Sequence, residues 1–162
     1  MTRMRIAVAA PTAASLLALI ATPALAKPPA NNALRNATVA GSLPFTATQD
    51  PRGSTVGGEL QPTCADVSGT VWYAFTPTST GTLNANTVGS NYDTVLAVYR
   101  LTGGSRDNKP VELLCDDDSG GSLTSALSFF ADAGATYYFQ IGKYGFRSKY
   151  TAAENSLTFN LS

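Results

Sequence analysis

Glycine-containing turns divide most of this chain into short segments, and this spacing limits what the chain can fold into. Between the glycines, residues alternate between apolar and polar or form short apolar runs, and no segment keeps a helical period. Many short strands separated by turns are typical of an all-β sandwich. Glycine supplies the positive φ angles that such turns need. The separating glycines are Gly53, Gly57, Gly58, Gly81, Gly103, Gly104, Gly120, Gly121 and Gly134.

The pattern predicts eight strands. Segment 94–101 is apolar on both faces, so we expect a central strand that is covered on both sides. Segment 156–161 alternates cleanly and should bury one face only. Trp72 and Tyr73 are neighbours on a strand and should point to opposite faces. The expected strands cover residues 43–48, 71–76, 82–87, 94–101, 111–115, 126–131, 136–141 and 156–161.

The first 26 residues have the pattern of a secretory signal peptide and are set apart from the fold. Arg3 and Arg5 form a positive start, an apolar stretch follows, and Ala24-Leu25-Ala26 places small residues at a cleavage site. The apolar stretch is short for a membrane-spanning helix. Removing 26 of the 162 residues leaves a mature chain, 27–162, of 136 residues. We expect it to form one secreted domain, extracellular or periplasmic, with no membrane span after cleavage.

Charge and composition exclude several functions. The mature chain holds nine basic and eleven acidic residues, a net charge of −2, so nucleic acid and anionic membranes are poor partners. The sequence contains no histidine, so neither a Ser–His–Asp nor a Cys–His arrangement is available. We therefore expect a non-catalytic protein, and a monomer. A small glycosidase-like secreted hydrolase that uses paired acidic residues stays open as the alternative.

The two cysteines, Cys64 and Cys115, both belong to the exported part. An even count in an oxidising compartment favours a disulfide. The bond would close a loop of about 50 residues and contribute roughly 4 kcal/mol on the chain-entropy model. Two buried free thiols are the alternative. No CxxC spacing is present, which argues against a thioredoxin-like role or a structural zinc.

Three adjacent aspartates, Asp116, Asp117 and Asp118, follow Cys115 directly. They form either a solvated acidic turn or part of a Ca²⁺ site. Because side chains alternate along an extended chain, two of the three would face one ion. A Ca²⁺ ion takes six to eight oxygen ligands, so other loops must contribute. Candidate donors are Asn31, Asn32, Glu59 and Asp93, although for Asp93 we favour a role as a strand-start cap.

A second cluster of interest combines aromatic and basic residues beyond residue 141, where we expect a loop. Tyr144, Phe146, Arg147 and Tyr150 belong to it. An exposed aromatic and basic loop is a candidate surface for an extracellular protein or polysaccharide. The alternative is a hairpin whose aromatic rings fold back over a sheet edge.

Four motifs, taken together and in order, resemble the bacterial pre-peptidase C-terminal domain, and the resemblance covers residues 31–162. It implies a secreted, jelly-roll-like antiparallel β-sandwich of about eight strands, usually appended to extracellular hydrolases and often stabilised by Ca²⁺. Some relatives bind collagen or polysaccharide. The motifs are VWYAF, GTLNANTVGSNYDTVLAVY, CDDDSGGSLTSALSF and AGATYYFQIGKY.

The same resemblance implies a set of metal ligands. Asn31-Asn32 resembles an N-terminal Asn-Asp pair of the family, with the second carboxylate lost. Glu59 resembles the family's glutamate before the first cysteine. The Asp116–Asp118 run resembles an Asn-Asp-Asp loop, and Tyr92-Asp93-Thr94 matches an aromatic-Asp-Thr step. The implied cofactor is one structural Ca²⁺ ion.

Overall fold

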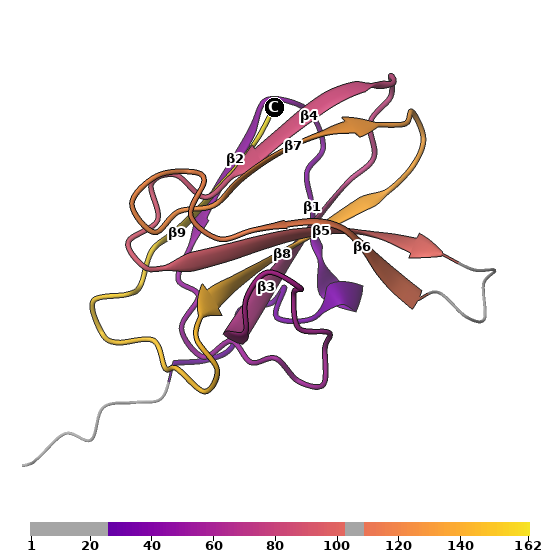
Figure 1. Ribbon diagram of the computed structural model, residues 1–162. Helices are drawn as coiled ribbons and strands as arrows, with labels where there is room; N and C mark the ends of the chain where they lie inside the picture. Colours follow the sequence, from indigo (N-terminus) through magenta and orange to yellow (C-terminus); the bar gives the residue numbers. More distant parts are fainter. Residues whose placement is uncertain (1–25, 103–108) are drawn as a thin grey trace, which may run out of the picture.

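The computed structural model describes residues 26–102 and 109–162, which form two facing β-sheets (Figure 1). The predicted signal peptide, 1–26, lies outside the described residues except for its last one. A short 3-10 turn, η1 (Leu34–Asn36), precedes the first strand. The strands are β1 (Thr38–Val39), β2 (Phe45–Gln49), β3 (Val67–Phe75), β4 (Gly81–Asn86), β5 (Thr94–Thr102), β6 (Lys109–Asp116), β7 (Ala126–Ala131), β8 (Tyr137–Tyr144) and β9 (Leu157–Leu161).

The sheet order is that of a jelly roll. One sheet has the order β1-β3-β8-β5-β6 and the other β2-β9-β4-β7. Strand β1 has two residues and pairs in parallel with β3, whereas the other eight strands pair with one another only in antiparallel fashion. If β2 to β9 are renumbered as strands one to eight, the four-stranded sheet has the order 1-8-3-6 and the other sheet, without β1, has the order 2-7-4-5. This is the strand order of a jelly roll. The expected all-β, jelly-roll-like antiparallel sandwich of about eight strands is confirmed.

The eight predicted strands correspond one to one with β2–β9, and two differences have clear causes. The two-residue β1 is too short to give a periodic signal. Strand β8 continues to Tyr144, so the predicted loop after residue 141 begins too early. The prediction of a loop rested in part on Gly142. In the structure, a Cβ atom added to Gly142 would lie 2.6 Å from the Val67 side chain. This glycine therefore allows close packing inside a strand and does not make a turn.

Aromatic rings fill the space between the sheets. Tyr73 stacks on Phe159 with ring centroids 4.7 Å apart, and Phe139 lies 5.3 Å from Phe159. Burying each large apolar side chain contributes roughly 1.5–3 kcal/mol. Strand β5 is buried on both faces over most of its length, as predicted. Trp72 points the opposite way from Tyr73 and is buried on the outer face of the five-stranded sheet, so the predicted split is confirmed.

A disulfide joins Cys64, in the loop between β2 and β3, to Cys115 near the end of β6, with the two Cα atoms 5.7 Å apart. The sequence-based disulfide is therefore confirmed. It spans a sequence separation of 51 residues and holds the edge strand β6 to the loop that leads into β3, a strand separated from β6 by β8 and β5. Cys115 also packs against the cluster of Trp72 and Tyr99.

Replacing both cysteines in the double variant Cys64→Ser/Cys115→Ser should lower the free energy of unfolding by about 4 kcal/mol, because the unfolded chain regains its loop entropy. We expect a fall in Tm of roughly 10 °C or more, measured by calorimetry. Thiol titration of the denatured, unreduced wild-type protein should find no reactive thiol. Two reactive thiols in that sample would contradict the bond.

Candidate functional site

The pairing of β5 with β6 brings three carboxylates together. Leu96 pairs with Asp116, and the strands run antiparallel, so the residues before β5 and after β6 meet at one end of the sheet. That end lies at the left of Figure 1. One carboxylate oxygen from each of Asp93, Asp117 and Asp118 lies within 4.8 Å of the others. We call these three residues the acidic cluster.

The acidic cluster holds oxygen atoms that bind nothing in the protein. Oδ1 of Asp93 and Oδ1 of Asp117 are both shielded from solvent and have no hydrogen-bond partner. Burial and the neighbouring charges of Asp118 and Asp93 raise the pKa of Asp117 to about 6. Burial and Asp118 also raise the pKa of Asp93. Shielded like charges without a partner are costly, so this arrangement favours a cation.

Lys143 lies near the acidic cluster, but its ammonium group is committed elsewhere. Its charge acts to lower the pKa of Asp93, against the larger effect of burial. The Nζ atom donates a hydrogen bond to Glu154 and lies 5.8 Å from the centre of the Tyr150 ring. Among the described residues, no salt bridge reaches Asp93, Asp117 or Asp118. Within the described residues, none of the three carboxylates therefore has a direct ion-pair partner, and Lys143 acts on Asp93 only from a distance.

Asp116 has a different role from its two neighbours. Its Oδ2 atom accepts hydrogen bonds from the backbone N–H groups of Ser119 (3.0 Å) and Ala126 (2.8 Å). Its Oδ1 atom accepts one from the Ser119 hydroxyl at 2.6 Å. These bonds close the loop between β6 and β7. Asp116 is therefore a loop cap in the structure and is not one of the three clustered carboxylates.

A buried hydroxyl network fixes the loop that carries Asp117. The hydroxyl of Ser125 lies within hydrogen-bonding distance of the carbonyl oxygens of Asp117 (2.8 Å) and Thr94 (2.7 Å). The hydroxyls of Thr87 and Thr94 lie 2.6 Å apart, and the Ser125 N–H donates to the Thr87 hydroxyl at 2.8 Å. All three side chains are buried. At Gly120 a Cβ would lie 2.8 Å from the Thr124 carbonyl oxygen, so only glycine fits there.

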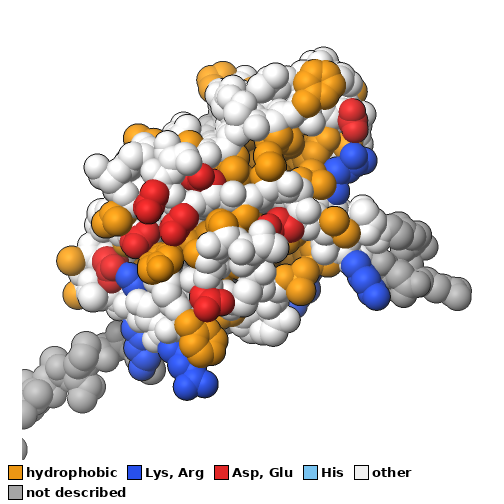
Figure 2. Space-filling model, viewed as in Figure 1, with side chains coloured by type: hydrophobic (Ala, Val, Ile, Leu, Met, Phe, Trp, Pro, Cys, Tyr) orange, Lys and Arg blue, Asp and Glu red, His pale blue; other side chains and the backbone are white. Residues whose placement is uncertain are grey.

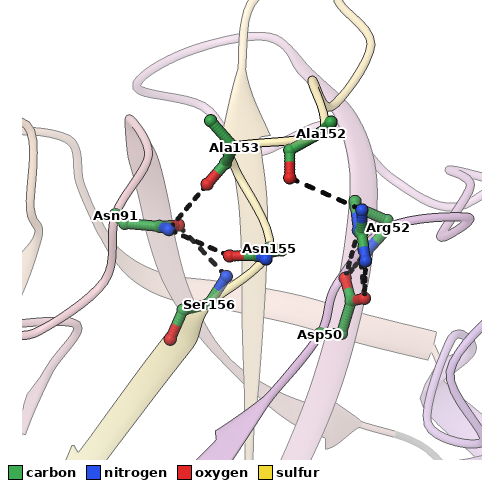
Figure 3. A network of polar contacts seen from close by, with 7 residues as sticks. All are labelled: Asp50, Arg52, Asn91, Ala152, Ala153, Asn155 and Ser156. Carbon is green, nitrogen blue, oxygen red and sulfur yellow. Dashed lines mark hydrogen bonds and ion pairs between the residues drawn. The ribbon is translucent and has the colours of Figure 1, made fainter.

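A second polar network holds the loop that carries Asp93 (Figure 3). The Asn91 side chain donates to the carbonyl oxygen of Ala153 at 2.7 Å and to Asn155 at 3.2 Å, and it accepts from the Ser156 N–H at 3.1 Å. Nearby, Arg52 pairs with Asp50 and donates to Ala152. Together these bonds join the turn after β2, the loop before β5 and the loop before β9.

The N-terminal asparagines lie apart from the acidic cluster. Asn31 is buried, donates to the Trp72 carbonyl oxygen at 3.0 Å and accepts from Gln49 at 3.2 Å. Asn32 exchanges hydrogen bonds with Thr55 at 2.6 and 3.2 Å. Both amides therefore bind protein groups. The structure does not place them with the aspartates, contrary to the sequence-based prediction, because each secures the N-terminal segment to the sheet or to a loop.

Glu59 serves the buried tryptophan. Its carboxylate accepts from the Trp72 indole N–H at 2.9 Å, from the Leu34 N–H at 3.3 Å and from the Thr70 hydroxyl. Among the described residues, the carboxylates that lie within 4.8 Å of one another are those of Asp93, Asp117 and Asp118, and Glu59 does not belong to this group. The predicted grouping of Glu59 with the aspartates is therefore wrong. The sequence signal that was missed is a buried indole N–H, which needs an acceptor.

The predicted aromatic and basic loop divides into an exposed part and a buried part. Tyr144 is 47% exposed and Phe146 is 63% exposed, with the Arg147 guanidinium 5.0 Å from the centre of the Phe146 ring. Tyr150 instead packs edge-to-face on Tyr92 at 5.2 Å, against the core. Tyr150 is therefore removed from the candidate binding surface, and the fold-back alternative holds for this one residue.

The exposed rings and the acidic cluster border the same groove. A depression of about 220 Å³ lies between the disulfide and the loop after β8, and Cys64, Asp66, Asp117, Tyr144 and Phe146 line it. Two backbone bonds bring these parts together: the Tyr144 N–H donates to the Asp93 carbonyl oxygen, and the Gly145 N–H to that of Asp66. Figure 2 shows acidic side chains gathered at this end, with hydrophobic side chains beside them. The sequence alone did not predict that the two regions adjoin.

The structure is similar to the pre-peptidase C-terminal domain of a collagenase from Bacillus anthracis, with a TM-score of 0.43, 17% identity and coverage of 78% of this chain and 92% of that one. It is also similar to the Yersinia pseudotuberculosis-derived mitogen, with a TM-score of 0.37, 18% identity and coverage of 74% and 84%. No family model and no curated protein matches the chain.

Residues 26–102 and 109–162 include no helix that is long and apolar enough to cross a membrane.

The hydroxyl network gives a first test of how the acidic cluster is positioned. Ser125→Ala removes the buried hydroxyl that bonds to the carbonyl oxygens of Thr94 and Asp117, and it should lower the free energy of unfolding, measured in urea, by about 2 kcal/mol. Ser128→Ala is the matched control, because Ser128 is an exposed serine on β7, the strand that begins directly after Ser125, and its replacement should change stability little. Equal effects of the two substitutions would show that the network does not hold the loop.

The raised pKa of Asp117 predicts a pH dependence in protein kept free of divalent cations. Between about pH 4 and 6 the folded chain retains a proton that the unfolded chain, with the ordinary value of 3.8, has released. Stability should therefore fall as pH rises through this window. Asp117→Asn should raise Tm at pH 7.5 by about 3 °C, after allowance for solvent screening, and change it less at pH 4.5. Thermal scans in chelator measure this, and a lower Tm at pH 7.5 than in wild type would contradict the repulsion.

Proposed function

We propose that this protein is a secreted, non-catalytic β-sandwich module that binds one structural Ca²⁺ ion and attaches to an extracellular protein or polysaccharide. The observation that carries the metal proposal is the acidic cluster. Asp93, Asp117 and Asp118 place one oxygen each within 4.8 Å of the others, and two carboxylate oxygens are shielded and unpartnered. A bound divalent cation would satisfy both atoms.

The donor set favours calcium over softer metals. All three side chains offer carboxylate oxygen, and the sequence has no histidine. Carboxylate oxygens are preferred by hard cations, and Ca²⁺ tolerates irregular sites with six to eight ligands. Asp118 is exposed, so further oxygens can reach the site from solvent or from a ligand. When bound, the ion would join the loop after β6 to the start of β5 and stabilise both.

Secretion is supported by two independent features. The first 26 residues have the pattern of a signal peptide. The Cys64–Cys115 disulfide is of the kind that persists in oxidising compartments.

One observation favours a second candidate function, a small glycosidase-like hydrolase. The raised pKa of Asp117 is a property that general acids share. Against it, Asp93, Asp117 and Asp118 gather in one place, whereas glycoside hydrolysis needs two carboxylates on opposite sides of a bond. Turnover of a glycan panel that disappears in Asp117→Asn or Asp118→Asn, with folding intact, would favour the hydrolase over the binding module.

Calorimetry tests the calcium proposal. With dissociation constants of about 0.1–1 mM, as in extracellular modules, roughly 10 mM Ca²⁺ should stabilise the fold by about 1.4–2.7 kcal/mol and raise Tm by about 5 °C. Asp117→Asn and Asp118→Asn should abolish the rise. Asp132→Asn is the control, because this carboxylate pairs on the surface with Arg100. A wild-type Tm that does not respond to Ca²⁺ would refute the metal site.

A further inference from the structure

The outer face of the five-stranded sheet is only partly covered. Leu34 in η1 and Ala37 directly after it pack on the buried cluster of Trp72 and Tyr99. Beside η1 this cover ends, and a mainly apolar pocket of about 490 Å³ opens over the sheet. It lies beside the ends of β3 and β5 and the start of β8, whereas the acidic cluster lies at the start of β5. The pocket is therefore at the opposite end of the sandwich from the proposed cation site.

The strand register explains why there is a pocket at this place. Val39 pairs with Ala74 and Ala74 pairs with Tyr138, so the three side chains form one row across β1, β3 and β8. Ala74 carries only a methyl group and stands between two larger side chains. Neighbouring strands lie about 4.7–4.9 Å apart, so Val39 and Tyr138 border a slot about one strand wide above Ala74. A single unbranched chain fits a slot of this width.

One charged residue, Arg35, lines the pocket, and the lining includes no aspartate or glutamate. Arg35 is exposed, and none of the salt bridges among the described residues includes it. Glu59 lines a neighbouring depression with Arg35, but its carboxylate accepts from the Trp72 indole and two further donors. The hydroxyls of Thr76 and Thr136, which also line the pocket, lie 2.8 Å apart and bond to each other. The guanidinium is therefore the polar group that remains for an anionic ligand.

Size and lining together define the class of ligand. The volume of about 490 Å³ falls within the roughly 300–1,000 Å³ of small-molecule sites, which are mostly apolar with a few polar groups. Val39 is 72% exposed at the rim, so an apolar ligand would remove it from water. A guanidinium matches a carboxylate through two parallel hydrogen bonds. The complementary molecule has one alkyl chain and one carboxylate.

We propose that this pocket binds a medium-length fatty acid, with the carboxylate at Arg35 and the alkyl chain in the slot above Ala74. This inference goes beyond the proposed function, because it assigns a second class of ligand to the other end of the sandwich. It requires no metal, since the acidic cluster does not line the pocket.

Isothermal titration calorimetry tests the site, with sodium decanoate added to the full mature chain in chelator and below the concentration at which decanoate forms micelles. The affinity should rise about fourfold for each CH₂ added between octanoate and decanoate. Arg35→Gln should weaken decanoate binding about fivefold and leave the binding of uncharged decanol unchanged. Ala74→Leu fills the slot and should weaken the binding of both at least tenfold. Lys149→Gln is the matched control, because Lys149 is an exposed basic residue in the loop after β8.

The outcomes are distinct for each alternative. No binding of decanoate to the wild-type chain, unchanged binding to folded Ala74→Leu, or an equal loss in Lys149→Gln would overturn the fatty-acid site. Binding of a peptide with an apolar C-terminal residue, without binding of decanoate, would assign the pocket to a protein partner and also overturn it. Circular dichroism shows whether Ala74→Leu folds, and Arg35→Gln changes only an exposed side chain, so it tests the site independently. Arg35→Gln should keep the Tm rise with Ca²⁺, so the failure of either proposal is visible without the other.

Discussion

The pairing of β5 with β8 on one side and with β6 on the other sets the position of everything at the acidic end of the sandwich. Strand β5 is buried on both faces, so a shift of one residue would exchange its two sets of side chains and is strongly disfavoured. This fixed register brings the residue before β5 beside the residues after β6. It also brings Thr94 opposite Lys143, next to the exposed ring of Tyr144.

The loops at this end depend on small polar side chains that are fully bonded. Ser125, Thr87 and Thr94 exchange hydrogen bonds in a region closed to solvent, and Asn91 joins two loops that are far apart in sequence. Each bond contributes only about 1 kcal/mol net, but losing one leaves a buried group unsatisfied at greater cost. The acidic cluster departs from this pattern, since two of its shielded oxygens have no partner. Among the described residues, the other buried side-chain atoms without a partner are the hydroxyls of Ser54, Ser68, Tyr73 and Tyr92, so the two unpartnered carboxylate oxygens both belong to this cluster.

Much of the fold was predictable because alternation and turn residues agree along the chain. The eight strands, the opposite directions of Trp72 and Tyr73, and the disulfide all followed from local pattern or cysteine count. The end of β8 was not predictable, because Gly142 serves close packing there and not a turn. The acidic cluster was only partly predictable: adjacent aspartates are visible in sequence, but the approach of Asp93 depends on register. Glu59 was misplaced because its carboxylate binds the indole of a tryptophan 13 residues away.

The disulfide also has a consequence for the open side of the five-stranded sheet. Strand β6 is an edge strand, and Val111, Leu113 and Leu114 on it are each about two-fifths exposed. Such an edge can exchange with the same strand of another copy or add further strands. Because Cys115 holds the end of β6 to the loop before β3, the strand cannot detach to be swapped between molecules. The covalent bond therefore hinders the exchange of β6 between copies of the chain.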